Sequence, residues 1–280
     1  MGWSRTCGST VATELAERLP VKKTYKLFIG GAFPRSESGR TYEAEGQNVA
    51  RASRKDVRDS VRAARAALPK WAGMTAYNRG QVLYRLAEMI ESRSSEFAEL
   101  STGRDEVDLT VDRIVWYAGW ADKLAQVLGS SNPVAGPYFN FTVPEPIGVV
   151  AILAPDEPPL LGLVSRVVPA LTGGNAVVAV ASETHPLAAI ELAEALATSD
   201  LPGGVVNLLT GHRDELAPWL ASHMDVNAID ITGANGSSTE LERAAADNVK
   251  RVVRGKPDSQ SPWEIASFLE LKTVWHPVGQ

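Results

Sequence analysis

The 280-residue chain has 44% hydrophobic and 22% charged residues, the composition of an ordinary globular protein. Its length allows one large domain or two small ones. The net charge of −5 gives no electrostatic reason to expect a nucleic acid or an anionic membrane as a partner. The single cysteine, Cys7, excludes an internal disulfide framework and a multi-cysteine metal site. The four histidines show no spacing typical of metal ligands.

The N-terminal twenty residues do not resemble a signal peptide, because they contain acidic side chains and lack an apolar stretch. No apolar run in the chain reaches the length that spans a membrane. We therefore expect a cytoplasmic protein with no membrane partner.

The next part of the chain predicts one strand and then three helices. Residues Tyr25–Phe28 indicate a strand that turns at Gly30-Gly31. Apolar residues at helical spacing predict the helices. These helices are expected at Ser53–Pro69, from near Thr75, and at Asp108–Leu128.

A connector and a half-exposed strand are expected next. Residues Ser130–Pro137 are rich in serine, proline and glycine, which is typical of a connector. Residues Tyr138–Val143 alternate between aromatic and polar side chains, which predicts a strand with one exposed face. Pro144 and Pro146 cannot donate to a sheet ladder, so we expect this strand at an edge or in an arm, and not in the middle of a sheet.

The segment from Pro146 to Val253 alternates short apolar runs with helix-length segments. The expected strands are Ile147–Leu153, Val177–Val180, Val205–Leu209, Ala228–Ile231 and Arg251–Val253. The expected helices are Pro159–Leu171, Pro186–Ala197, Asp214–Ser222 and Thr239–Asn248. This alternation predicts an α/β fold: a Rossmann-like, doubly wound parallel sheet of about five strands, with the N-terminal helices packed on it. A nucleotide would lie at the carboxyl ends of these strands.

The C-terminal part contains a β-prone run, Phe268–Trp275, that is too short to form a domain. A single strand must pair with something. We expect this strand to have no partner within the chain.

Several motifs follow one another along the chain. They are Leu27–Gly31, Tyr117–Lys123, Glu145–Val150, Leu201–Asn207, Ile231–Gly233 and Lys272–Pro277. In this order they resemble the aldehyde dehydrogenase superfamily. The resemblance implies an NAD-binding-like domain at residues 21–137 and 147–256, and oligomerisation strands at residues 138–146 and 268–280. It also implies that the catalytic domain, which follows the Rossmann half in the family, is absent between them.

The resemblance further implies that the chain lacks the groups that oxidise an aldehyde. This chemistry needs a thiolate, donors for an oxyanion and a general base. Cys7 lies outside every matching motif. The family's oxyanion asparagine falls on Glu157, whose carboxylate accepts hydrogen bonds and repels an oxyanion. The family's basic glutamate precedes a Gly-Gly-Lys run, and Arg254-Gly255-Lys256 retains only the end of that run. We therefore assign no catalytic residue.

The cofactor site implied by the resemblance is degraded. The family's ribose-binding lysine falls on Val180, whereas its glutamate is kept as Glu183. Glu183 could bind a ribose diol, or it could be a loop acid that is solvated or helps to start the helix at Pro186. Gly233 and Gly236 match part of the family's pyrophosphate turn, although Ser237 and Glu240 could form a capping box that makes this loop purely structural. We expect weak NAD binding at most, and no metal site.

Three functions compete at this point. The first is a pseudoenzyme subunit that assembles with a full-length aldehyde dehydrogenase, or as a homodimer through the C-terminal strand. The second is an NAD(P)-dependent oxidoreductase that acts on aldehydes only as part of a complex. The third is a stand-alone nucleotide-binding module. The C-terminal strand favours the first, because an isolated binding module would not need it.

Overall fold

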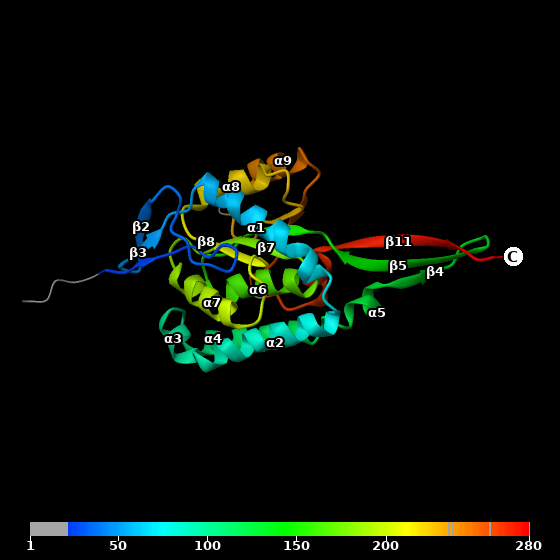
Figure 1. Cartoon of the computed structure of the whole chain (residues 1–280), viewed down its shortest axis with the longest axis horizontal. Helices are drawn as coiled ribbons and strands as arrows, with labels where there is room; N and C mark the ends of the chain where they lie inside the picture. Colours follow the sequence, from blue (N-terminus) through cyan, green and yellow to red (C-terminus); the bar gives the residue numbers. More distant parts are fainter. Residues whose placement is uncertain (1–21, 235, 237, 258, 280) are drawn as a thin grey trace, which may run out of the picture.

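A five-stranded parallel sheet forms the centre of the molecule (Figure 1). The computed structural model describes residues 22–234, 236, 238–257 and 259–279. The strands of this sheet, in spatial order, are β10 (Arg251–Val253), β9 (Ala228–Asp230), β6 (Val149–Leu153), β7 (Ala176–Val180) and β8 (Val206–Leu209). Every residue of β6, β7, β8 and β9 is buried, as expected of strands that are covered on both faces. The predicted doubly wound α/β sheet is confirmed.

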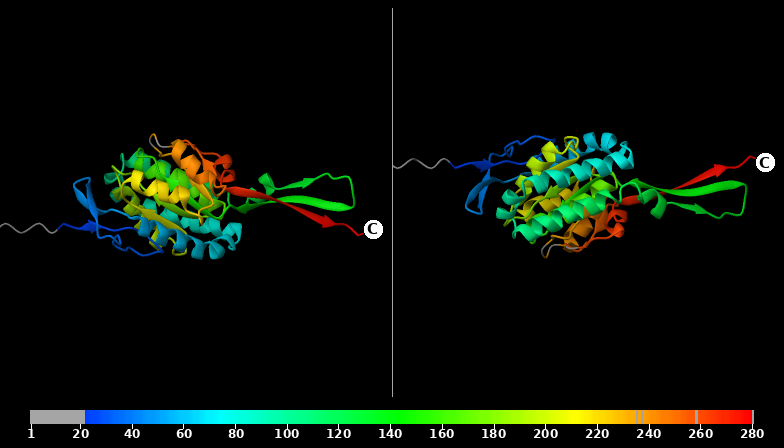
Figure 2. Two further views of the ribbon diagram at one scale, coloured as in Figure 1. Left: turned by 90° about the horizontal axis from the view of Figure 1, so that it is seen from above. Right: turned by 90° about the horizontal axis from the view of Figure 1, so that it is seen from below.

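Helices cover both faces of this sheet in three layers (Figures 1 and 2). One face is covered by α1 (Arg54–Ala72), α8 (Arg213–Ser222) and α9 (Ser238–Ala246). The other face is covered by α6 (Pro159–Thr172) and α7 (Leu187–Thr198), with α2 (Ala76–Ser92) and α4 (Arg104–Ala118) packed outside them. Alternate residues of β6 point into these two cores, Val150 and Ile152 into one and Val149 and Ala151 into the other.

The predicted helix Asp108–Leu128 is wrong, because the structure contains two helices there. Helix α4 ends at Ala118, and the N–H of Gly119 donates to the carbonyl of Val115 at 3.0 Å. A turn then leads to α5 (Leu124–Leu128). A further short helix, α3 (Ser94–Glu99), was not predicted. Glycine at the end of a helix is a common stop signal, which the apolar periodicity concealed here.

The N-terminal strands also differ from the prediction. The structure places β1 at Thr24–Tyr25, and Phe28 only forms a bridge to Leu208 at the edge of the main sheet. A hairpin of β2 (Thr41–Ala44) and β3 (Gln47–Ala50) was not predicted. Its turn residues, Glu45 and Gly46, both have positive φ angles, of 51° and 69°. A glutamate in this conformation is unusual, so the sequence gives little signal for the turn.

A three-stranded antiparallel sheet, which we call the arm, extends from the body (Figure 2). It consists of β4 (Ser130–Asn132), β5 (Tyr138–Pro146) and β11 (Leu269–Pro277). The expectation that this strand lies at an edge or in an arm holds for the arm, but within the arm β5 is the middle strand, between β11 and β4. Strand β4 pairs only with Asn140–Thr142, however, so Pro144 and Pro146 have a neighbouring strand on one side alone.

Strand β11 follows the short helix α10 (Pro262–Ala266) and pairs with β5 along its whole length. The register runs from Leu269 opposite Pro146 to Pro277 opposite Tyr138. The expectation that this strand has no partner within the chain is therefore wrong. None of the helices formed by the described residues is long and apolar enough to cross a membrane.

Candidate functional site

The carboxyl edge of the main sheet is the place where a ligand is expected in a fold of this kind. Strand β6 lies between β7 and β9, and the chain proceeds outward from it in both directions. The loops after β6 and β9 therefore meet at the switch point of the sheet. The loops after β7 and β8 adjoin them at the same edge.

Glu183, the predicted ribose-binding acid, lies in the loop after β7 and contacts the start of α8. Its Oε1 is 2.5 Å from Nδ1 of His212, and its Oε2 accepts a hydrogen bond from the backbone N–H of Arg213 at 3.2 Å. It thus stabilises the N-terminus of α8, and not the helix that follows Pro186. A carboxylate there also interacts favourably with the helix dipole. Its role in ribose binding stays a prediction.

An ionic network that the sequence did not reveal spans the same edge. Both carboxylate oxygens of Asp156 accept hydrogen bonds from the guanidinium of Arg213, at 2.9 and 3.1 Å. Arg213 is buried and also donates to the carbonyl of Ala154 at 2.8 Å. The backbone N–H of Glu183 donates to Asp156 at 3.1 Å. The one sequence signal was the position of Asp156, directly before Glu157, on which the family's oxyanion asparagine falls.

Glu157, at the family's oxyanion-asparagine position, is largely exposed. Its Oε1 lies 3.0 Å from Nε2 of His185, whose Nδ1 lies 3.5 Å from a carboxylate oxygen of Glu45. The carboxylate of Glu157 can only accept hydrogen bonds when it is ionised. It therefore offers no donor to an oxyanion.

Glu106, a residue that the sequence analysis did not single out, caps the N-terminus of α6. Its Oε1 accepts hydrogen bonds from the N–H groups of Leu160 and Leu161, both at 2.8 Å. Its Oε2 accepts from the N–H and the hydroxyl of Thr102 at 2.8 and 2.7 Å. The helix after the first strand is a common pyrophosphate site in Rossmann folds. Here a buried carboxylate already occupies those amides.

The predicted phosphate-turn glycines, Gly233 and Gly236, play different structural roles. The N–H of Gly233 donates to the carbonyl of Leu153 at 2.9 Å, and a Cβ at Gly233 would lie 2.1 Å from the carbonyl oxygen of Ala154. Gly233 thus lets the loop after β9 lie directly on the end of β6. Gly236 has a φ of +81° and open space around it. Ser237, and with it the expected capping box, lies outside the described residues.

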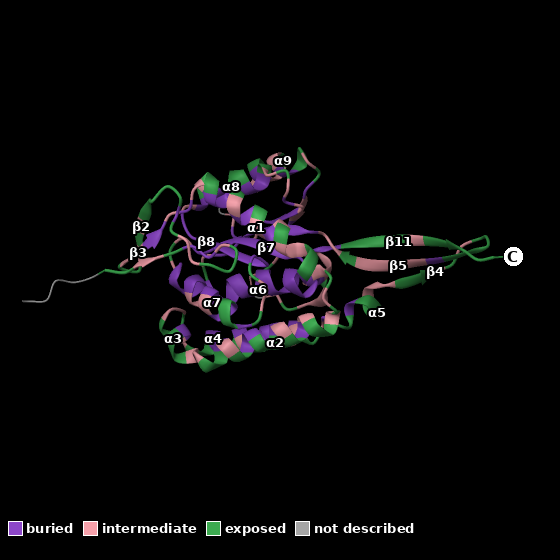
Figure 3. Ribbon diagram, viewed as in Figure 1, coloured by how far each residue is buried: buried purple, intermediate pink, exposed green. Residues whose placement is uncertain are grey.

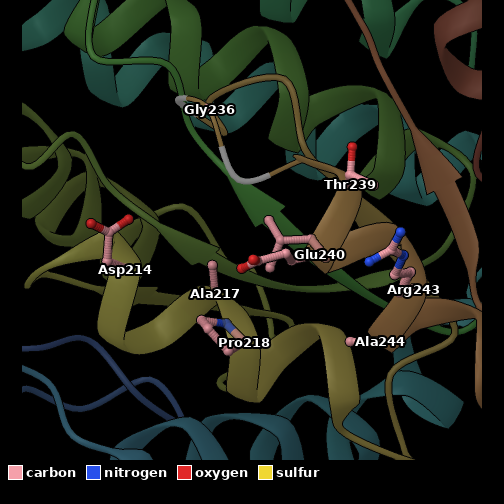
Figure 4. A pocket seen from close by; sticks show the side chains of 9 residues that line it. Asp214, Ala217, Pro218, Gly236, Thr239, Glu240, Arg243 and Ala244 are labelled. Atoms are coloured by element: carbon pink, nitrogen blue, oxygen red, sulfur yellow. The ribbon is translucent and has the colours of Figure 1, made fainter.

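A hollow of about 690 Å³ lies between α8 and α9, next to Gly236 (Figure 4). Figure 4 shows the side chain of Glu240 directed from α9 toward α8. Asp214 and Glu240 bring carboxylates to this hollow, whereas Arg243 brings a cation. The remaining lining residues are Ala217, Pro218, Gly236, Thr239, Leu241 and Ala244. The hollow has room for an aromatic ring, but the two carboxylates disfavour a phosphate.

Several groups that would bind a dinucleotide at this edge are absent or are already hydrogen-bonded within the protein. Val180, at the family's ribose-lysine position, is fully buried in β7 and offers no charge. The carboxylate of Glu106 accepts hydrogen bonds from the N–H groups at the start of α6. The carboxylate of Glu183 accepts one from the N–H at the start of α8. Among the described residues, no group of three or more His, Cys, Asp or Glu side chains is placed to hold a metal ion.

Comparison with known proteins identifies the family. Residues 40–256 match the model of the Aldehyde dehydrogenase family. The chain belongs to this family. It is 34% identical over 248 residues to the cytosolic aldehyde dehydrogenase 1 of Elephantulus edwardii, which covers 81% of this chain and 49% of that protein. It is 32% identical over 265 residues to the putative aldehyde dehydrogenase DhaS of Bacillus subtilis, with coverages of 87% and 53%.

Solved structures give the same result for this aldehyde dehydrogenase family chain. The PnpE structure from Pseudomonas sp. WBC-3 matches with a TM-score of 0.79 and 31% identity, over 84% of this chain and 51% of that one. An NAD+ complex of an aldehyde dehydrogenase from Bacillus cereus matches with a TM-score of 0.78 and 29% identity, over 82% and 50%. The chain thus spans about half the length of the curated relatives it matches.

Proposed function

We propose that this chain is a non-catalytic member of the aldehyde dehydrogenase family, which acts as a subunit in assembly with a full-length NAD-dependent relative. The observation that carries this proposal is the arm. Its two outer strands are joined only through β5, and it extends from the body with few buried side chains (Figure 3). A protein that worked alone would gain nothing from such a projection.

The side chains of the arm support a role in assembly. Trp275 and Leu271 of β11 are 59% and 60% exposed, and Phe139 of β5 is 51% exposed. Tyr138 and Trp275 pack edge to face, with their ring centroids 5.7 Å apart. Exposed apolar groups gathered on one small sheet are typical of an interaction surface. A full-length aldehyde dehydrogenase is the partner proposed first, and a second copy of this chain is the alternative.

The carboxyl edge of the sheet supports the non-catalytic part of the proposal. Nucleophilic aldehyde oxidation requires a thiolate beside an oxyanion-binding group. The only cysteine of the chain, Cys7, lies outside the matched residues 40–256. Glu157 brings a carboxylate to the loop after β6, where a developing oxyanion would be repelled.

The test is light scattering on the full chain, alone and mixed with a full-length aldehyde dehydrogenase from the same host. We expect a mixed complex that disappears in the double variant Leu271→Glu, Trp275→Glu. The matched control is Leu109→Glu, since Leu109 is similarly exposed, at 54%, but lies on α4 and not in the arm. A mixed complex that survives the double variant, or no mixed complex at all, would refute the proposal.

A nucleotide-binding module is the second candidate, because the hollow between α8 and α9 has room for an aromatic ring such as a base. A relative of known structure was solved as an NAD+ complex, so NAD is the ligand to try first. When bound, NAD would supply a hydride acceptor, which this chain could use only with catalytic residues lent by a partner. NADH formation by the mixed complex, above that of the full-length relative alone, would support this role as an active component of a complex.

A further inference from the structure

A hollow of about 430 Å³ lies between α8 and the start of α1, and it is distinct from the hollow between α8 and α9. Figure 1 shows α1 and α8 next to each other on one face of the main sheet. The apolar part of this hollow consists of Leu216, Pro218 and Trp219, which all belong to α8. Neither function proposed above uses this hollow.

An aromatic ring and a cation are held together in this hollow. The indole ring of Trp219 is on a residue that is 42% exposed, although it lies in a regular helix. The guanidinium carbon of Arg54, the first residue of α1, lies 4.4 Å from the centroid of the Trp219 ring. A guanidinium at this distance is attracted to the ring and stacks on it. The two groups are therefore in place before a ligand arrives.

Arg54 differs from the cations around it. Each of its neighbours already contacts a carboxylate of the protein; these neighbours are Arg40, Arg51, Lys55 and Arg58. In the part of the chain that the structure describes, no carboxylate pairs with Arg54. Its N–H groups are thus available to the carboxylate of a ligand, which a guanidinium can bind with two parallel hydrogen bonds.

The same hollow contains a carboxylate that no cation of the described residues neutralises. Asp214 is exposed in the first turn of α8 and lines the hollow. Pro218, one turn later, has no N–H to donate to the carbonyl of Asp214, so this carbonyl lacks its usual helical donor. Glu215 is different, because the hydrogen bond from Arg51 lowers the pKa of its carboxyl below the usual range. Asp214 therefore provides the acceptors of the hollow.

We infer that this hollow binds a free α-amino acid with an aromatic side chain. The α-carboxylate contacts Arg54, the α-ammonium contacts Asp214, and the ring of the ligand packs against Trp219. Arg54 and Asp214 line one hollow but form no ion pair with each other, so a zwitterion can bridge them. A simple carboxylate would leave Asp214 without a cation, and a simple amine would leave Arg54 without an anion. A phosphate would be repelled by Asp214.

The site belongs to the body of the molecule and not to the arm. The inference therefore goes beyond the proposed function, and neither depends on the other. Because the hollow is open and the ligand is small, we expect a dissociation constant in the millimolar range.

The first test compares three ligands that differ in one charged group at a time. Ligand-observed NMR titrations of the full chain use L-phenylalanine, 3-phenylpropanoate, which lacks the ammonium, and 2-phenylethylamine, which lacks the carboxylate. We expect phenylalanine to bind at least about tenfold more tightly than either analogue. Binding of an analogue as tight as that of phenylalanine, or no binding of phenylalanine at millimolar concentrations, overturns the inference.

The second test assigns each contact to a residue. Arg54→Gln and Trp219→Leu should each weaken phenylalanine binding by at least about tenfold. Asp214→Asn should remove the advantage of phenylalanine over 3-phenylpropanoate. Both Arg54 and Trp219 are exposed, so these variants should keep the fold, which circular dichroism checks. Unchanged binding in Arg54→Gln overturns the inference.

Two further variants are matched controls for the position of the ligand. Arg62→Gln removes an exposed arginine of α1 that does not line the hollow, and it should leave binding unchanged. Arg243→Gln removes an arginine of the hollow between α8 and α9, which Asp214 also lines. It should likewise leave binding unchanged. A loss of binding in Arg243→Gln as large as that in Arg54→Gln would place the ligand on the other side of α8 and overturn the inference.

Discussion

Arg166 on α6 and Asp230 at the end of β9 form an ion pair in which both side chains are completely buried. The distance from Nε of Arg166 to Oδ2 of Asp230 is 2.7 Å, and Nη1 of Arg166 lies 2.6 Å from Glu264 of α10. A Cβ at Gly255 would lie 2.1 Å from the guanidinium carbon of Arg166. The segment that leads from the main sheet to the arm is therefore held on the body by a buried cation.

Replacing Asp230 by alanine should lower the free energy of unfolding by about 3–5 kcal/mol, because a buried guanidinium loses a principal counter-charge. Denaturant unfolding followed by circular dichroism measures this. The control is Glu145→Ala, which breaks the exposed pair with Lys272 and should cost at most about 1 kcal/mol. Similar losses for the two variants would contradict the assigned importance of the buried pair.

Replacing Glu106 by alanine should lower the free energy of unfolding by about 2–3 kcal/mol. Four hydrogen bonds to one buried carboxylate are lost, and two N–H groups of α6 are left without an acceptor. The matched control is Asp105→Ala, an exposed acid on the same helix, which should change stability by at most about 0.5 kcal/mol. If both variants unfold at the same denaturant concentration, Glu106 does not cap α6 as described.

Lys250 should make the protein more stable as the pH rises from 8 to 10. Burial lowers the pKa of Lys250 to about 8 from its ordinary 10.5. Between these values the unfolded chain binds more protons than the folded one, so the free energy of unfolding increases with pH. From pH 8 to pH 10, the free energy of unfolding of the native chain should rise by about 2 kcal/mol relative to that of Lys250→Met. Urea unfolding at pH 8 and pH 10 tests this, and a difference independent of pH would contradict it.

The purified chain alone should not oxidise aldehydes. The family resemblance implies that the thiol, the base and the oxyanion asparagine are absent, and the loss of one such group typically costs about a hundredfold or more in rate. The measurement is NADH formation with a panel of aldehydes. NADH formation proportional to the amount of this chain, and unchanged in Cys7→Ala, would show that the prediction is wrong.

NAD should bind more weakly to this chain than to its full-length relatives, by about tenfold to a hundredfold. The charge-assisted hydrogen bond of a ribose lysine, worth about 1.5–3 kcal/mol, is missing at Val180. Glu183 must also leave His212 and the N–H of Arg213 before it can bind a ribose. Titration calorimetry tests this directly. Low-micromolar affinity that is lost in Glu183→Ala would mean that the site is intact.

The main sheet could be predicted because each of its strands is a local signal. The residues of β6 and β7 form continuous apolar runs, and such runs flanked by helix-length segments specify a buried parallel sheet without knowledge of distant contacts. The break between α4 and α5 was missed because Val115 and Leu124 both fit one apolar stripe. That pattern does not record that Gly119 ends the helix.

The contents of the candidate site could not be predicted in the same way. Asp156 and Arg213 are 57 positions apart in the sequence, and Glu106 and Leu160 are 54 positions apart. Such pairs form only when the folded chain brings distant loops together, and no periodicity encodes them. The family resemblance located Glu183, Gly233 and Gly236, but it could not show that neighbouring polar groups would use the same atoms.

The pairing of β5 with β11 also has a consequence for the order of folding. Thr142 and Thr273 face each other across the arm although 131 positions separate them. Closing so long a loop is slow, and it follows the formation of the intervening domain. Until β11 pairs with β5, the aromatic side chains of β5 and one of its strand edges are exposed to solvent. Synthesis of this chain therefore passes through a period in which the nascent protein is prone to aggregate, and in which a chaperone has a defined segment to protect.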